Sequence, residues 1–180
     1  MFLLTVEVAS IYSQGGKLRR IHNLIFSPSF ETAEKINKEL QKRGANLLSD
    51  GRPMMGISSK NLLELVLEID KKALFIPCHV WTPWFSLYGS NSGFDSVEEC
   101  FGEYSKYIYG IETGLSSDPE MNWQIEELDN RSILSFSDAH SPAKMGREAT
   151  VFEVSNESLE LSYELIRQAI MKPSSNNSAL

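Results

Sequence analysis

The sequence has little cysteine and no long apolar run, and each shortage excludes a class of protein. Only Cys78 and Cys100 occur. They form no Cys-x-x-Cys pair, which argues against a disulfide framework or a zinc ribbon and fits a reducing cytoplasm. No apolar run approaches the roughly 20 residues that span a bilayer, and the N-terminus lacks the basic-then-apolar pattern of a signal peptide. We therefore expect a cytoplasmic protein with no membrane partner.

Excess positive charge is absent as well. The formal net charge is -7, which argues against bulk electrostatic adhesion to nucleic acid but allows a local basic patch. The chain has no internal repeat, and its 180 residues suit about one domain with a proper core. The exception is the Ser/Asn-rich stretch 173–180, for which we expect a flexible tail.

Strand-like runs alternate with helical patterns along the chain. We expect helices over 30–43, 60–69, 96–104, 118–128 and 158–171. We expect strands over 2–10, 21–26, 73–77, 107–112, 133–134 and 149–154. This alternation predicts an α/β protein with a parallel sheet, and polar residues that recur at strand ends favour a barrel over an open sheet.

An acid and an imidazole follow the short strand at 133–134. Asp138 and His140 are two residues apart, so on an extended segment both side chains would point to one spot. Carboxylate and imidazole are donors that suit zinc, manganese or iron. The pair alone is a weak signal, since a loop aspartate beside a half-exposed histidine is the alternative.

Three further donors lie on other predicted strands. Glu7 is in the middle of an apolar run, where an ionised carboxylate is costly to bury unless it is paired or bound to a cation. His79 follows the buried strand 73–77, and Glu112, a weaker candidate, ends another strand. Such a mixture of donors suits a zinc or manganese centre with an open position for water, which predicts phosphoester hydrolysis. His22 fits a core histidine as well as a ligand.

Basic and aromatic residues accompany these strands. Lys17, Arg19 and Arg20 place three cations on one short segment, which is either a solvated loop or a contact to phosphate. The stretch 80–89, which includes Trp84, is too aromatic for an ordinary solvated loop. It either packs over the end of the sheet or forms a platform on which a base or sugar stacks.

Longer motifs surround these residues. They are Ile11-Tyr12-Ser13-Gln14-Gly15-Gly16-Lys17, His79-Val80-Trp81-Thr82-Pro83-Trp84-Phe85, Glu112-Thr113-Gly114-Leu115-Ser116-Ser117-Asp118-Pro119, Ser137-Asp138-Ala139-His140-Ser141-Pro142-Ala143-Lys144 and Gly146-Arg147-Glu148. With the Glu7 strand and Pro77-Cys78-His79, they resemble the PHP (polymerase and histidinol phosphatase) superfamily. More narrowly, they resemble endonuclease Q and its bacterial relatives, from about Phe2 to Val154.

The resemblance implies a partial, distorted (β/α)7 TIM-like barrel of the PHP type that lacks its first strands. The family's first His-x-His motif has no counterpart here, as though upstream sequence were missing. By this resemblance residues 1–154 form the partial hydrolase domain, 155–172 a C-terminal helix and 173–180 a flexible tail.

The resemblance also implies a ligand set and a cofactor. Glu7 would be a bridging ligand, His79 a ligand of the third motif, and Asp138 and His140 the ligands of the last, with Glu112 as a weaker fifth. The complete family site holds two or three ions, Zn²⁺ or Mn²⁺, with Mg²⁺ as a third option. No catalytic residue is expected beyond these ligands.

The function implied is that of a metal-dependent phosphodiesterase, similar to a repair endonuclease that nicks DNA on the 5′ side of a deaminated base or an abasic site. Lys17, Trp84 and Arg147 would contact this DNA. Because part of the ligand set is absent, we expect weak or no nuclease activity unless a partner supplies the missing strands. The alternatives are a PHP phosphomonoesterase that acts on a small metabolite and a non-catalytic remnant that binds a metal or a partner.

Overall fold

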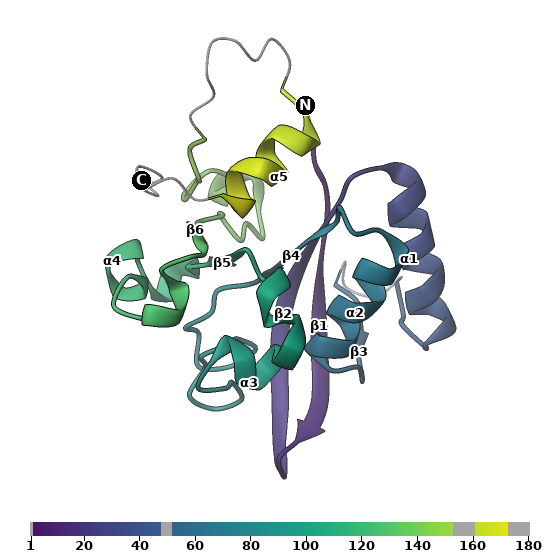
Figure 1. The fold of residues 1–180 in the computed structure, drawn as a ribbon, viewed down its shortest axis with the longest axis horizontal. Coiled ribbons are helices and arrows are strands. Elements are labelled where there is room, and N and C mark those ends of the chain that lie inside the picture. Colours follow the sequence, from purple (N-terminus) through teal and green to yellow (C-terminus); the bar gives the residue numbers. More distant parts are fainter. Residues whose placement is uncertain (1, 48–51, 153–160, 173–180) are drawn as a thin grey trace.

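The structure is a computed structural model that describes residues 2–47, 52–152 and 161–172. Its strands are β1 (Leu4–Gln14), β2 (Lys17–Ser27), β3 (Met54–Met55), β4 (Leu74–Pro77), β5 (Gly110–Glu112) and β6 (Ser132–Leu134). Its α-helices are α1 (Phe30–Lys42), α2 (Ser59–Ile69), α3 (Val97–Phe101), α4 (Pro119–Asn122) and α5 (Tyr163–Met171) (Figure 1). Short 3₁₀ turns lie at Gly102–Tyr107, Gly114–Ser116, Glu126–Leu128 and Pro142–Lys144.

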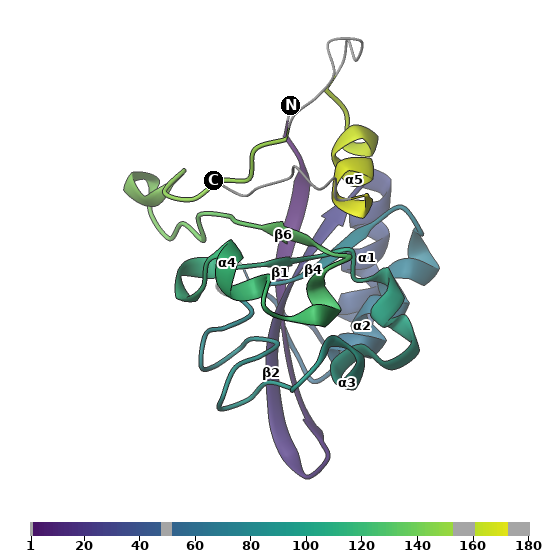
Figure 2. The same cartoon turned by 60° about the vertical axis from the view of Figure 1, so that its left-hand side comes forward.

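The long β1–β2 hairpin corrects the expectation of a parallel sheet. Gly15 and Gly16 have φ angles of 62° and 73°, and Gln14 pairs with Lys17 across them. Two successive residues with positive φ form the tight turn whose twist suits an antiparallel hairpin, and glycine adopts them without strain. The chain therefore returns beside itself instead of crossing over through a helix, and the turn projects beyond the rest of the molecule (Figures 1 and 2).

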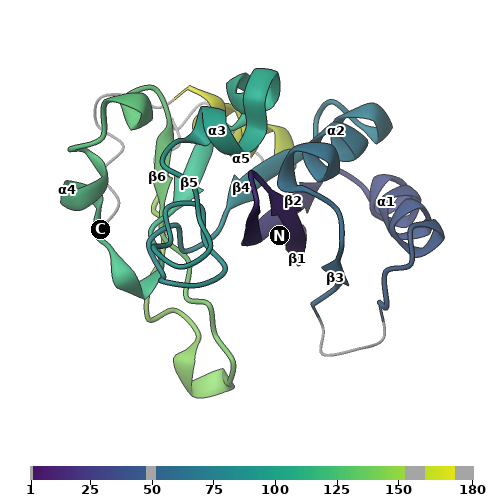
Figure 3. The ribbon, with the colours of Figure 1, turned by 90° about the horizontal axis from the view of Figure 1, so that it is seen from below.

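The described strands form a mixed arrangement. One sheet has the order β3-β1-β2-β4, in which β2 and β4 are antiparallel and β1 and β3 are parallel. A second sheet pairs β5 with β6 in parallel. The Val80 N–H donates to the Glu112 carbonyl at 3.0 Å and joins the two sheets at their boundary. Viewed from below, the strands follow one another from β6 to β3 (Figure 3), and within the described ranges they do not close into a barrel.

Two apolar clusters lie on opposite faces of this layer, because alternate residues of a strand point to opposite sides. Phe75 of β4 packs with α1, α2 and α3 in the larger cluster. Its neighbours Leu74 and Ile76 pack with α5 in the smaller one. The side with the larger cluster is therefore the helix-covered face, and the opposite face carries polar side chains beyond the smaller cluster.

Side-chain caps set the starts of the helices. Ser29 accepts the Thr32 N–H at 3.1 Å and begins α1, and Ser58 accepts the Asn61 N–H at 3.1 Å and begins α2. Both helices match their expected ranges within two residues. The predicted helix 96–104 instead ends at Phe101, because the next residue, a glycine, has a φ of 56°.

Four other expectations differ from the structure or lie wholly or partly outside the described residues. The predicted helix 118–128 is interrupted after α4, where the Asn122 side chain donates to the Asp118 carbonyl at 2.7 Å. Residues 149–152 form no strand, and 153–154 lie outside the described residues, as does the tail at 173–180. The last helix begins at Tyr163, after the cap Ser162.

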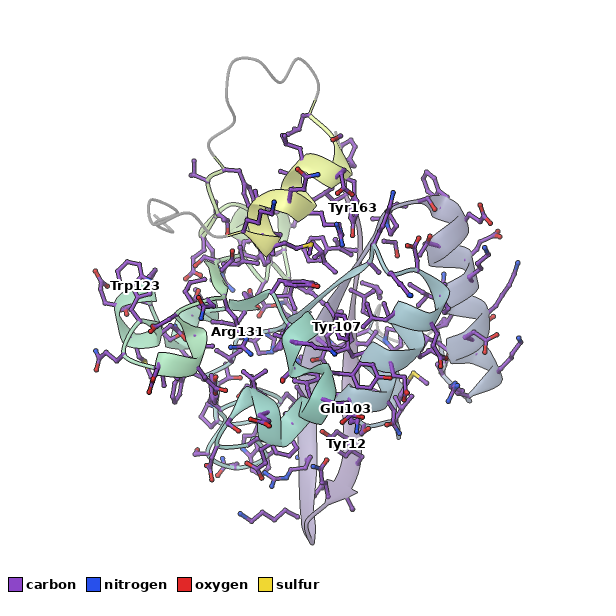
Figure 4. All side chains as sticks on the ribbon, in the orientation of Figure 1. Tyr12, Glu103, Tyr107, Trp123, Arg131 and Tyr163 are labelled. Atoms are coloured by element: carbon purple, nitrogen blue, oxygen red, sulfur yellow. The ribbon has the colours of Figure 1, made fainter. Side chains whose placement is uncertain are left out.

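Helix α5 lies at the end of the sheet where β1 begins (Figures 1 and 2). The Tyr163 hydroxyl (Figure 4) donates to the carbonyls of Phe26 at 3.1 Å and Lys72 at 2.8 Å. The Ser132 hydroxyl donates to the Ile170 carbonyl at 2.8 Å. These bonds attach both ends of the helix to the strands beneath it. Among the described residues, no helix combines the length and the apolar character needed to cross a lipid bilayer.

Candidate metal centre

Three donor atoms converge on the face opposite α1, α2 and α3. His22 Nδ1 lies 2.8 Å from Glu7 Oε1 and 3.0 Å from His79 Nε2. Glu7 is on β1, His22 is on β2 and His79 directly follows β4, so three neighbouring segments contribute one side chain each. Both histidines are buried and Glu7 is half-buried. One carboxylate oxygen and two imidazole nitrogens within this reach could hold a metal ion.

The end of β5 holds His79 in place. Glu112, only 2% exposed, accepts the His79 N–H through Oε2 at 2.7 Å. His79 has a φ of 30°, a conformation that few residues with a Cβ adopt and that recurs at functional sites. A Cβ on Gly114 would meet the His79 Cβ at 2.4 Å, so only glycine fits behind the imidazole. Glu112 therefore positions His79, whatever further role it has.

The aromatic stretch after β4 packs against the second histidine. The Phe85 ring lies 4.6 Å from the His22 ring, centroid to centroid. The main-chain N–H of His22 also donates to the main-chain carbonyl of Phe85 at 3.0 Å. Beside it, the Arg20 guanidinium lies 5.0 Å over the Trp84 ring, which is 49% exposed. Part of the stretch therefore packs over the strands, which is one of the two alternatives, and the Trp84 indole is partly exposed; the stacking of a base on it stays a prediction.

Burial and neighbouring charges set the protonation of the donors. Burial lowers the pKa of His22 below its ordinary value, and the Glu7 carboxylate opposes this only in part. Burial tends to raise the pKa of Glu7, but His22, Arg52 and His79 outweigh it, so this pKa is lowered. A neutral imidazole and an ionised carboxylate are the forms that bind a metal.

These residues fit a bound cation. The Glu7 Oε1 atom is buried and receives no hydrogen bond of good geometry, although ring and guanidinium nitrogens lie within 3 Å of it. A neutral His22 ring has one N–H, so Nδ1 can donate to Glu7 Oε1 or to His79 Nε2, but not to both. A cation in contact with all three donors would satisfy them together, and buried polar atoms without partners call for such an explanation.

A second group, Cys78, His79 and Glu112, also lies within metal-ligand reach. It is the poorer site. Burial, followed by the charges of Glu112, Glu7 and Asp138, raises the pKa of the Cys78 thiol well above its ordinary value, and only the thiolate is a strong ligand. The carboxylate of Glu112 is already bound to the main chain of His79.

The structure does not bring the late acid–imidazole pair into either group. Asp138 has a φ of 43°, so the segment turns there instead of continuing extended; His140 Nδ1 lies 3.8 Å from Asp138 Oδ1, but neither side chain joins Glu7, His22 and His79 in the described groups. The His140 ring is 71% exposed, and its Nδ1 bonds to the Asp138 carbonyl at 2.9 Å. The Asp138 charge nevertheless adds to the raised pKa of the buried Cys78 thiol.

The expected DNA contacts occupy different places. Lys17 is exposed beside the hairpin turn, five residues along β2 from His22, or roughly 17 Å on an extended strand. Trp84 lies near the donors, as described. Arg147 donates to the Ser137 carbonyl at 2.7 Å and the Asp138 carbonyl at 3.2 Å, so it holds the Asp138 loop. Arg19, buried, pairs with Glu99 at 3.2 Å and is structural.

Two curated proteins and two solved structures resemble this chain, whereas no family model matches it. The uncharacterized protein YqxK of Bacillus subtilis is 35% identical over 133 residues, which cover 71% of this chain and 32% of that protein. The uncharacterized protein MJ0043 of Methanocaldococcus jannaschii is 41% identical over 93 residues, which cover 50% of this chain and 11% of that protein. The chain thus spans a third or less of these relatives.

The solved structures match nearly the whole chain. The lesion-specific endonuclease PfuEndoQ from Pyrococcus furiosus has a TM-score of 0.77 at 30% identity, over 96% of this chain and 39% of that one. Endonuclease Q in complex with a 27-mer duplex that has an abasic lesion at its active site has a TM-score of 0.76 at 32% identity, over 92% and 38%. The structural neighbours are endonuclease Q.

Two residues of the centre are not among the predicted ligands: the sequence leaves His22 open between a core histidine and a ligand, and it does not point to Arg52. His22 could have been found by counting register from Gly15-Gly16, because a two-residue turn pairs Ala9 with His22 and so puts His22 on the face of Glu7. Arg52 carries no such signal. It lies just before β3, and only the folded structure brings its guanidinium to Glu7.

Proposed function

We propose that this chain is part of a metal-dependent phosphodiesterase that nicks DNA on the 5′ side of a deaminated base or an abasic site. The observation that carries the proposal is the structural match to endonuclease Q, which spans nearly the whole chain at 30–32% identity. The convergence of Glu7, His22 and His79 supports it independently, because these donors suit metal-assisted hydrolysis.

The donors have distinct parts in this proposal. Glu7, His22 and His79 would hold a Zn²⁺, Mn²⁺ or Mg²⁺ ion, and Asp138 and His140 would contribute after a movement of their exposed loop. When bound, such an ion supplies an activated water and stabilises negative charge at phosphorus. Glu112 fixes the His79 main chain at 2.7 Å, and Phe85 covers the His22 ring and excludes water from that side.

The exposed Trp84 supports DNA over a small metabolite. An indole that faces solvent beside the donors offers a surface on which an unpaired base can stack, and the guanidinium of Arg20 above it adds a positive charge for the backbone. Extrusion of a base costs least at a damaged or abasic position. A phosphomonoesterase needs no such platform.

Binding and nicking of matched duplexes test this proposal. We would compare duplexes with one abasic site, one uracil or no lesion, by fluorescence anisotropy and by gel assay with added Mn²⁺ or Zn²⁺. We expect preferential binding of the damaged duplexes and slow nicking 5′ of the lesion, slow because Asp138 and His140 do not reach the other donors. Equal binding of all three duplexes together with no nicking would contradict the proposal.

Three variants separate the parts of the site. His79→Ala should abolish nicking, because it removes a donor. Trp84→Ala should weaken binding of the damaged duplex by roughly tenfold, the usual effect of one stacked base. Trp123→Ala is the matched control, because Trp123 is equally exposed, at the end of α4 (Figure 4). It should leave binding unchanged.

A further inference from the structure

Arg52 supplies positive charge to the donor cluster. Its Nε lies 2.9 Å from Glu7 Oε1, and its Nη1 lies 3.4 Å from His22 Nε2. The guanidinium therefore contacts two of the three donors, and one of its contacts is the same carboxylate oxygen that faces His22 and His79. Arginine is charged at every relevant pH, so this charge is permanent.

The contact with His22 fixes where the ring proton must be. A guanidinium only donates, so Nε2 accepts from Arg52 and the proton of a neutral ring is on Nδ1. A cation bound to Nδ1 needs the opposite arrangement, with the proton on Nε2. Nε2–H and Nη1–H would then face each other as two donors 3.4 Å apart. Arg52 in its present position and a cation on Nδ1 are therefore incompatible.

Electrostatic repulsion also makes Arg52 in its present position incompatible with a bound cation. A cation within contact distance of Glu7 Oε1 would lie close to the guanidinium, and two positive charges this close repel each other strongly in a partly buried site. The Arg52 side chain is 32% exposed, so it can turn into solvent. Glu7 cannot leave as easily, because it is on the central strand β1.

We propose that Arg52 is a resident counter-cation of this centre, which a metal ion displaces from Glu7 and His22 when it binds. The inference rests on the proposed function, since it needs a metal at these donors. It assigns Arg52 two positions: paired with the donors before metal binds, and turned toward solvent afterwards. Arg52 thereby competes with the metal and sets its affinity.

Metal affinity of variants tests the competition without any activity measurement. We would titrate Zn²⁺ and Mn²⁺ into the protein by competition with a chromophoric chelator. Arg52→Gln removes the charge and leaves a shorter, polar side chain, and we expect it to bind metal roughly fivefold or more tightly. Arg43→Gln is the control: it removes the same charge at the exposed end of α1 and should bind as the unsubstituted protein does.

A second measurement uses the unsubstituted chain and guards against a variant that does not fold. Phenylglyoxal modifies free guanidinium groups, and peptide mass spectrometry reports the rate at Arg52. We expect this rate to rise when Mn²⁺ is added, while the rate at Arg43 stays constant. If Arg52→Gln binds metal no more tightly than the unsubstituted protein, or if added Mn²⁺ leaves the modification rate at Arg52 unchanged, the inference about Arg52 fails while the proposed metal centre stands. If the unsubstituted protein and Arg52→Gln both bind no metal, the inference and the proposed metal centre fail together.

Discussion

At the scale of single residues, the centre is a set of polar groups that the fold buries at a cost. Glu7 and His22 lie on adjacent strands with Arg52 beside them, and each group satisfies its neighbours only in part. Buried polar groups are tolerated when partners of suitable geometry or a bound ion repay their desolvation. A cluster of this kind is weak evidence for stability and stronger evidence for a function.

The pH dependence of stability follows from the burial of His22. Its pKa is lowered from an ordinary value of 6.5, chiefly by burial, so the unfolded chain takes up a proton in a range where the folded protein does not. The free energy of unfolding without added metal should therefore fall as pH drops below about 6.5. The lowered pKa of Glu7 adds a further loss only below its ordinary value of 4.5.

Urea unfolding between pH 8 and 5 measures this effect. His22→Asn should remove most of the slope between pH 6.5 and 5, while His140→Asn, a change in an exposed ring, should leave the slope as it is. A variant His22→Asn with an unchanged slope would show that another group governs the titration.

At the scale of elements, the sequence predicted individual helices better than it predicted which strands pair and in which direction. The helices α1 and α2 were predicted within two residues because a serine cap and an apolar stripe both mark them. The antiparallel pairing of β1 and β2 differs from the prediction, because strands that alternate with helices favour parallel pairing, whereas Gly15-Gly16 forms a hairpin turn here. The turn at Asp138 has no marker, since aspartate also fits an extended strand.

The close contact between the 3₁₀ turn Gly114–Ser116, after β5, and the His79 segment can be tested by substitution. Gly114→Ala would bring a Cβ to 2.4 Å from the His79 Cβ and 2.8 Å from its Cα, at a φ of 60°. Main-chain atoms cannot turn aside, so we expect a loss of roughly 2–4 kcal/mol in the free energy of unfolding.

The matched control for this change is Gly44→Ala. Gly44 also has a positive φ, 86°, but a Cβ there would meet nothing within 4 Å. Only backbone strain of about 1–2 kcal/mol applies. Denaturant unfolding of both variants measures the difference, and equal losses would mean that the close approach to His79 costs nothing.

At the scale of the whole molecule, the sequence predicted two of the side chains that converge, but not the strand arrangement that brings them together. Glu7 and His79 were expected as ligands from their places on strands, and the structure brings them together with His22. Asp138 and His140 remain a prediction, because their loop is exposed and its position relative to the donors depends on long-range packing. The open, mixed sheet could not be foreseen, since which strands pair is decided by contacts far apart in sequence.

Metal binding should also stabilise the whole fold, because the three donors come from β1, β2 and the end of β4 and converge only in the native state. At a free metal concentration of 100 times Kd, one site adds about 2.7 kcal/mol. For a chain of this size that is a rise in Tm of roughly 5–10 °C, which EDTA should reverse. Thermal unfolding with and without Mn²⁺ or Zn²⁺ measures it. His79→Ala should abolish the rise and His140→Ala should reduce it only if the Asp138 loop closes on the metal; a full rise in His79→Ala would mean that the ion binds elsewhere.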